Sequence, residues 1–114
     1  MVKILLTRNS QGQLIAFNVQ GHAGCGAYGN DIVCAAVSVL AQTAVIGLEE
    51  YLRLKPQVKV EAGSLHCSLQ EIGNRASETA AILETMVMGL RAIALDYPDN
   101  VCIVEEEVEN DAED

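Results

Sequence analysis

Tryptophan is absent from this 114-residue chain, and aromatic residues make up only 4% of it. Basic residues are also few, because seven lysines and arginines stand against sixteen acidic residues and give a formal net charge of −9. A nucleic-acid groove needs a basic stripe and aromatic side chains on which bases stack. The composition therefore argues against direct nucleic-acid binding, while a basic protein partner remains compatible with the charge.

A long apolar leader is missing from the start of the chain. Lys3 is followed by only three consecutive apolar residues before Thr7, which falls well short of a signal-peptide core. We therefore expect a cytoplasmic protein. In such a reducing compartment, cysteines at positions 25, 34, 67 and 102 are expected to be thiols, ligands or nucleophiles rather than structural disulfides.

Apolar residues make up half of the chain, which excludes wholesale disorder and predicts one domain with a substantial core. We place this domain at residues 1–104. Residues 105–114 hold seven of the sixteen acids and no base, so they are predicted to form a solvated, mobile tail. An alternative is that the tail attracts a basic partner by electrostatic steering.

The hydrophobic pattern predicts an α+β fold. Residues 2–6 and 13–19 are rich in apolar and β-branched types and flank a turn-like segment, as in a β-hairpin. The rest of the pattern predicts a helix over 31–54, a second hairpin with strands over 57–61 and 64–70 around Ala62-Gly63, a helix over 74–97 and a strand over 101–104. The predicted order is ββαββαβ, with two helices packed on one face of a mainly antiparallel sheet.

The first predicted helix carries no charge over residues 32–48. At 1.5 Å per residue this stretch is roughly 25 Å long, slightly short of a membrane span, and polar residues interrupt it. We therefore expect this helix to lie in the core or between two subunits.

Chemistry is expected where a glycine-rich segment meets this helix. Residues 21–29 hold four glycines and predict a loop, and Asn30 and Asp31 are both suitable N-caps. With Asp31 as the cap, Cys34 is the third helical residue, where unpaired N–H groups and the helix dipole favour a thiolate. His22 lies twelve residues earlier and is a candidate general base for it.

Simpler interpretations exist for each of these residues. Cys34 precedes two alanines on an apolar helix and could fill the core, and His22 could brace the loop. Asp31 could orient His22, although a helix cap is the commoner role. Cys25 could inhibit Cys34 through a redox reaction, or it could be an incidental thiol, which is the interpretation that we favour.

The other cysteines suggest structural roles. His66 and Cys67 are neighbours on a predicted strand and should point to opposite faces, and Cys102 is expected in the core. A zinc site built from His22, Cys25 and Cys34 with His66 or Cys67 would not match a compact zinc spacing, so we predict neither metal nor cofactor.

One stretch resembles a known family signature. It reads Gly21-His22-Ala23, then Gly29, then Asp31-Ile32-Val33-Cys34-Ala35-Ala36-Val37-Ser38, and is similar to the signature of the ribosomal-processing cysteine proteases of bacteria. Length and element order also resemble that family from end to end.

The resemblance implies a cytosolic cysteine endopeptidase. Such an enzyme removes the N-terminal extension of a large-subunit ribosomal protein, number twenty-seven in its series. His22 matches the general base and Cys34 the nucleophile, while Asp31 matches a motif position that either orients His22 or caps the helix. The loop and helix start would supply oxyanion or substrate contacts, through Gly21, Ala23, Gly24, Gly26 and Gly29.

The resemblance also implies a homodimer, and it implies no membrane or nucleic-acid partner. The alternative function is a non-catalytic, ribosome-associated binding or dimerisation module that keeps the fold. Intact His22 and Cys34 favour the protease.

Overall fold

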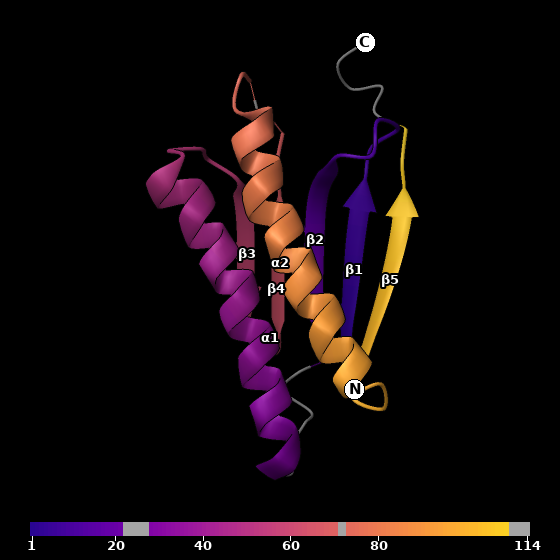
Figure 1. Cartoon of the computed structure of the whole chain (residues 1–114). Coiled ribbons are helices and arrows are strands. Elements are labelled where there is room, and N and C mark those ends of the chain that lie inside the picture. The colour runs from indigo at the N-terminus through magenta and orange to yellow at the C-terminus, as the bar shows by residue number, and fades with distance from the viewer. Residues whose placement is uncertain (22–27, 71–72, 110–114) are drawn as a thin grey trace.

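The computed structural model describes residues 1–21, 28–70 and 73–109, and it shows a sheet with helices packed on one side (Figure 1). In chain order the elements are β1 (Val2–Arg8), β2 (Leu14–Gln20), α1 (Tyr28–Ile46), the π-helical turn η2 (Gly47–Tyr51), β3 (Gln57–Glu61), β4 (Ser64–Ser68), α2 (Ala76–Asp96) and β5 (Val101–Glu107). The predicted α+β class and the order ββαββαβ are confirmed.

The sheet is mixed, with the strand order β3-β4-β2-β1-β5. Its β1–β2, β2–β4 and β3–β4 pairs are antiparallel, and its β1–β5 pair is parallel. The predicted hairpins are both present, and the sheet is mainly antiparallel as expected. The parallel pair places the last strand, β5, beside the first strand, β1, at one edge of the sheet.

The core lies between the sheet and the two helices. Side chains alternate along β1, where Ile4 and Leu6 are buried toward the helices and Lys3 is exposed on the other face. Glycine allows the helices to approach each other, because a Cβ at Gly89 would lie 2.9 Å from Cδ1 of Leu40. The buried part of α1 consists of Val33, Cys34, Val37, Ala41, Ala44 and Val45.

The first helix differs from the prediction at both ends. It begins at Tyr28 instead of 31, is α-helical to Ile46, and continues as the π-helical turn to Tyr51 instead of reaching 54. Arg53 has a φ of 59°, a left-handed conformation that stops the helix before the proline. The segment Ile32–Tyr51 is long and apolar enough to span a membrane, and here it packs on the sheet (Figure 1).

The second half of the chain matches the prediction more closely. The strand predicted over 64–70 ends at Ser68, and the helix predicted over 74–97 runs from Ala76 to Asp96. Within this helix, the buried residues are Thr79, Leu83, Met86, Val87 and Leu90, as expected for one apolar face.

The acidic C-terminal segment is partly folded. Strand β5 continues to Glu107, beyond the predicted domain boundary at 104. Arg8 Nε donates to Glu105 at 2.9 Å, Arg91 also pairs with this carboxylate, and the Val108 N–H donates to the Arg8 carbonyl at 2.8 Å. Residues 105–107 therefore belong to the sheet, because two arginines compensate the charge that predicted a solvated tail.

Candidate active site

The junction between β2 and α1 is organised by Gly21, directly before His22. The Gly21 N–H donates to the Gly63 carbonyl at 3.1 Å, and its φ is 87°. A Cβ here would lie 2.6 Å from the Met1 carbonyl oxygen, which is shorter than any tolerated contact. Glycine is therefore required for the chain to leave the sheet at this point.

This contact changes the role predicted for Gly21. Its N–H is already bonded to Gly63, so it is not a donor for a substrate oxyanion. Sequence reasoning treated Gly63 only as part of a hairpin turn and missed its contact with Gly21. Both glycines adopt a positive φ at the same end of the sheet, and glycines at strand ends were the signal that could have indicated a close approach.

The early start of α1 also moves the candidate nucleophile along the helix. Cys34 is the seventh residue of α1, not the third, and Asp31 lies inside the first turn rather than at the cap. In a regular α-helix the N–H of a seventh residue bonds to a carbonyl four residues earlier, so the Cys34 N–H is not an unpaired donor. The dipole acts mainly on the first turn, and Gly29 lies there.

Cys34 itself was expected to be an exposed thiolate, and the structure differs on both points. The residue is buried, with 8% of its surface exposed, and it belongs to the hydrophobic core. Its sulfur is held in a disulfide bond. The helix therefore presents Cys34 toward the hydrophobic core.

Several predicted site residues lie outside the described part of the chain. These are His22, Ala23, Gly24 and Gly26, together with Cys25 and the side chain of Asp31. The pairing of His22 with Cys34 and the orienting role of Asp31 therefore stay predictions.

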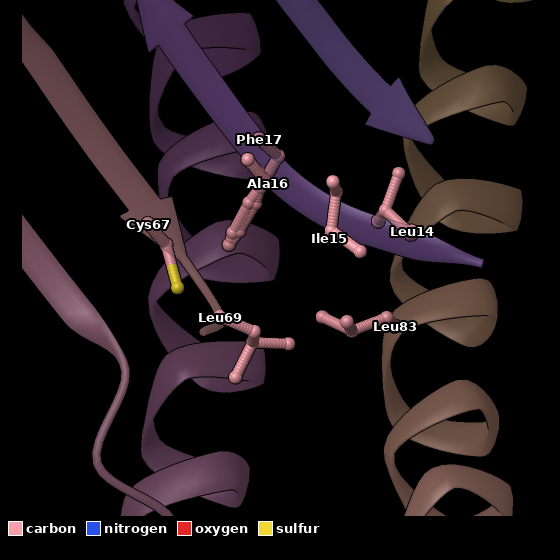
Figure 2. Close-up of a pocket in the computed structure, with 7 residues that line it drawn as sticks. All are labelled: Leu14, Ile15, Ala16, Phe17, Cys67, Leu69 and Leu83. Carbon is pink, nitrogen blue, oxygen red and sulfur yellow. The ribbon is translucent and has the colours of Figure 1, made fainter. Parts of the chain in front are cut away.

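The remaining cysteines have different environments. Cys67 is buried on β4 beside apolar side chains of β2 (Figure 2). Its neighbour His66 is exposed, so the two side chains lie on opposite faces, as predicted. Burial, with a smaller contribution from Glu49, raises the pKa of the Cys67 thiol to about 12. A thiol with this pKa is protonated at neutral pH and is a poor nucleophile.

Figure 2 also shows the cavity beside Cys67. Its volume is about 10 Å³, which is the room of one water molecule at most. This space is too small for a peptide. Its lining residues are Leu14, Ile15, Ala16, Phe17, Cys67, Leu69 and Leu83.

Cys102 was predicted to lie in the core, and that prediction is wrong. It pairs with Lys3 on the outer face of the sheet and is partly exposed. The alternation along β5 buries Val101 instead, because β5 aligns with β1 in parallel and Val101 matches Val2. Cys102 is thus separated from α1 by the sheet.

A metal centre finds no support within residues 1–21, 28–70 and 73–109. Over these ranges, no group of three or more His, Cys, Asp or Glu residues is arranged to hold a metal ion. His22 and Cys25 lie outside them, so the expectation of a metal-free protein stays a prediction.

Comparison with known proteins decides the family. The family model for the cysteine protease Prp matches residues 1–102. The chain belongs to the Prp family. A ribosomal processing cysteine protease Prp from Staphylococcus aureus is 30% identical over 104 residues, covering 89% of this chain and 95% of that protein. The fold and enzyme class predicted from the signature are confirmed, and the chain is a cysteine protease.

Two crystal structures of Prp from S. aureus extend the similarity to the fold. The complex with a substrate peptide has a TM-score of 0.85 and 26% identity, covering 93% of this chain and 100% of that one. The complex with a covalently linked product peptide has a TM-score of 0.82 and 28% identity at the same coverage. These comparisons therefore favour the protease over the alternative of a non-catalytic module.

Proposed function

We propose that this Prp-family chain removes the N-terminal extension of a ribosomal protein precursor, number twenty-seven of the large subunit. In this proposal Cys34 is the nucleophile and His22 is the general base and acid. The observation that carries it is the S. aureus Prp structure with a covalently linked product peptide, which shares the fold of this chain at 28% identity. A covalent peptide adduct is the intermediate expected of a nucleophilic cysteine.

The surroundings of the other two described cysteines argue against either of them as the nucleophile. Cys67 has a pKa raised by burial and adjoins only a small cavity. Cys102 lies on the sheet face that carries no helix. Cys34 is on α1, whose start follows the family signature around His22, and is therefore the cysteine we assign to the chemistry.

The proposed mechanism follows from these assignments. The Cys34 sulfur attacks the scissile carbonyl, and His22 protonates the leaving amine. N–H groups in the first turn of α1, including Gly29, and those of Ala23, Gly24 and Gly26 stabilise the oxyanion. Water activated by His22 then releases the acyl group and restores the thiol.

The test of this function needs reducing conditions, which keep the Cys34 sulfur as a thiol. A sulfur in a disulfide has no thiolate with which to attack a carbonyl. Reduced enzyme is therefore the form in which this function must be tested.

The direct test incubates reduced wild type, Cys34→Ala and His22→Ala with the ribosomal protein precursor and measures product masses. We expect one cut with the wild type and a loss of rate of about 10³-fold or more in either variant. Cys102→Ala is the matched control, since it removes a thiol on the other sheet face, and should cut at the wild-type rate. Cutting by Cys34→Ala at the wild-type rate would contradict the assignment.

We also propose that the enzyme is a homodimer that uses the outer side of its helices. An apolar groove of about 390 Å³ lies between α1 and α2, and Val39, Ile46 and Met88 are exposed on the same helices. Apolar area of this kind is usually covered by a partner. The groove is lined by Leu40, Thr43, Ala44, Gly47, Ala81, Ile82, Thr85 and Met86.

Sedimentation equilibrium tests the dimer. Ala81→Arg places a charge in the groove and should shift the protein to monomer. Ala80→Arg is the matched control, because Ala80 lines a small cavity on another side of α2 with Gln13 and Leu14. A wild-type monomer at all concentrations, or an unchanged dimer in Ala81→Arg, would contradict this interface.

The cytoplasm is the compartment we propose for this enzyme, because its proposed substrate is a ribosomal protein precursor. Fractionation of cells that express the tagged protein tests this, with recovery in the membrane or secreted fraction as the contrary result.

A further inference from the structure

Strand β3 lies at one edge of the sheet. The strand order β3-β4-β2-β1-β5 gives it β4 as its neighbour, and no other strand within residues 1–21, 28–70 and 73–109 pairs with it. An edge strand offers main-chain N–H and C=O groups to an extended chain that lies alongside. The free side of β3 is therefore a surface at which the sheet can gain one strand.

The register identifies the main-chain groups that face this free side. A two-residue turn joins β3 to β4, so Glu61 and Ser64 form a hydrogen-bonded pair. Bonded and non-bonded pairs alternate along an antiparallel ladder, which leaves the N–H and C=O groups of Val58 and Val60 on the free side. The same alternation turns the Leu69 N–H, just after β4, toward β2, where it donates to a carbonyl at 2.8 Å.

The side chains of these two valines lie on the face of the sheet that carries the helices. Val58 pairs with Cys67 and Val60 pairs with Leu65, and both partners are buried in the core. Paired residues project to the same face of a sheet. Val60 is nevertheless 67% exposed. A chain that pairs with β3 would thus place every second side chain beside an exposed β-branched residue.

The other edge strand, β5, is less suited to pairing. Its second half carries successive exposed acids, Glu105–Glu107, and charges of this kind discourage the addition of a strand. On β3 the charges are balanced, because Lys59 Nζ lies 3.5 Å from Glu61 Oε2, on the face opposite to the valines. The β3 edge therefore accepts an extended chain without a row of like charges.

The direction of β3 connects this edge with the candidate active site. The strand runs toward the turn that contains Gly63, whose carbonyl accepts the Gly21 N–H at 3.1 Å. Figure 1 shows this turn at the end of the sheet where α1 begins. A peptide that lies along β3 therefore extends toward the part of α1 that carries Cys34.

We propose that the free edge of β3 binds the substrate of this protease as an added strand. The occupant is an extended segment of the substrate next to the bond that is cut, since such a segment has main-chain groups that can pair with Val58 and Val60. The proposal rests on the function proposed above, in which a precursor peptide is the substrate. Main-chain hydrogen bonds fix the register, and apolar substrate residues at alternate positions pack beside Val60.

Amide hydrogen exchange measured by NMR tests this contact without cleavage. The protein is Cys34→Ala, which lacks the proposed nucleophile, and the probe is a synthetic peptide that spans the N-terminal extension of the precursor. We expect the Val58 and Val60 amides to exchange about 10-fold or more slowly with saturating peptide. The Lys59 amide is the internal control, because it pairs with β4 and should exchange slowly in both states.

Two results of this measurement would overturn the proposal. One is unchanged exchange at both valines while the peptide is bound. The other is slow exchange at both valines without peptide that becomes fast on dilution of the protein, since a second copy of the chain would then occupy the edge.

A second experiment uses wild-type enzyme and a series of substrate peptides, each N-methylated at one residue. An added strand predicts that kcat/KM decreases about 10-fold at every second residue of the paired segment and changes little between them. Losses confined to the residues that flank the cut bond, with no alternation beyond them, would contradict strand addition.

Val60→Pro tests the edge from the side of the enzyme. It removes an N–H from the free side of β3 and keeps the pairing with β4, so we expect a folded protein with kcat/KM about 10-fold lower. Glu107→Pro is the matched control on β5, where the Val108 N–H donates to the Arg8 carbonyl and the Glu107 N–H faces outward. Circular dichroism monitors folding, and equal kcat/KM in Val60→Pro and wild type would contradict the proposal.

These measurements separate the two proposals. Slower exchange at Val58 and Val60 with a peptide that the wild type never cuts would contradict the proposed function and support the binding edge. Cleavage of the precursor without slower exchange at these valines would support the function and overturn the edge.

Discussion

The two ends of the sheet are held together in different ways. At the end away from the start of α1, Arg8 pairs with Glu84 at 2.6 Å and with Glu105 at 2.9 Å, and it also donates to the Gly12 carbonyl at 3.0 Å. At the other end, backbone groups meet directly, with the Gly21 N–H on the Gly63 carbonyl at 3.1 Å. Charged side chains fix the first end, and close backbone packing fixes the second.

The difference separates stability from function in space. Asn9 and Arg8 secure the β1–β2 turn, since Asn9 Oδ1 accepts from the Gln11 and Gln13 N–H groups at 2.9 Å. At the second end the chain instead leaves the sheet at Gly21, directly before the candidate base His22. Changes at the first end should reduce the stability of the fold, whereas changes at the second should also reduce cleavage.

The largest effect is expected from Gly21→Ala. The methyl group would lie 2.6 Å from the Met1 carbonyl oxygen at a φ of 87°, so the junction before His22 must move. We expect a loss of roughly 3 kcal/mol in the free energy of unfolding, with cleavage almost abolished. Urea unfolding and kcat/KM measure both.

Gly12→Ala is the matched control for this comparison. Gly12 also has a positive φ, 82°, but a Cβ there meets nothing within 4 Å. We expect a loss of only about 1 kcal/mol from the left-handed backbone and no change in kcat/KM. Equal effects of the two substitutions would show that close packing at Gly21 is unimportant.

Arg8→Ala should produce the next largest effect, at the charged end. The Arg8 guanidinium is partly buried, and its hydrogen bonds to Glu84 and Glu105 raise its own pKa and lower that of Glu105. We expect a loss of about 2 kcal/mol in unfolding free energy, with kcat/KM unchanged. The exposed pair Lys59–Glu61 supplies a control, because Lys59→Ala should cost about 0.5 kcal/mol or less.

A clear loss of kcat/KM in Arg8→Ala, in addition to the loss of unfolding free energy, would contradict this prediction. It would show that the two ends of the sheet are coupled. The sharper readout is the ratio of kcat/KM between variant and wild type at a temperature where both are folded.

A smaller effect is expected from the ionisation of Cys67 at high pH. Its folded pKa of about 12 exceeds the ordinary value of 9.0, so the unfolded chain loses this proton first as pH rises. The contribution of the protonated Cys67 thiol to the free energy of unfolding is complete below about pH 9 and is lost as the pH rises toward 12. Between pH 9 and 10.5 we expect a decrease of about 1.5 kcal/mol in unfolding free energy.

Other groups titrate in the same range, so the comparison with Cys67→Ala isolates this thiol. The variant should be less stable at pH 8 because a buried sulfur is removed, yet its stability should decrease less between pH 9 and 10.5. Parallel curves for variant and wild type would mean that the thiol ionises as easily in the folded protein as in the unfolded chain.

The smallest effect is expected from truncation after Val108. This truncation keeps β5 and its contact to Arg8, and it removes four acidic residues. The end of β5 lies at the opposite end of the molecule from the start of α1 (Figure 1). Since the Debye length is about 8 Å at physiological salt, we expect cleavage rates within a factor of about 2.

Measurement at low salt sharpens this last prediction. A steering role for the tail would appear there as a clear loss of kcat/KM in the truncated protein. Deletion of all residues from 105 onward is a poorer experiment, because it also removes Glu105 from Arg8 and Arg91.

The local sequence pattern was sufficient to predict most elements of the fold. The two hairpins, the two helices and the final strand follow from turn residues and hydrophobic periodicity over short windows, and each is found. Boundaries were less accurate where distant groups intervene. Glu105 extends β5 because Arg8 and Arg91 lie beside it, and neither arginine is near it in the sequence.

For the site, the sequence determined the signature around His22 and Cys34, whose resemblance to the family predicted the enzyme class. Only the tertiary structure decided that Gly21 must be glycine, that Cys102 faces outward and that Cys34 is buried. These properties depend on strand pairing and on contacts between residues far apart in the chain. A linear pattern carries local conformational preference, whereas the close approach of two segments exists only after the chain has folded.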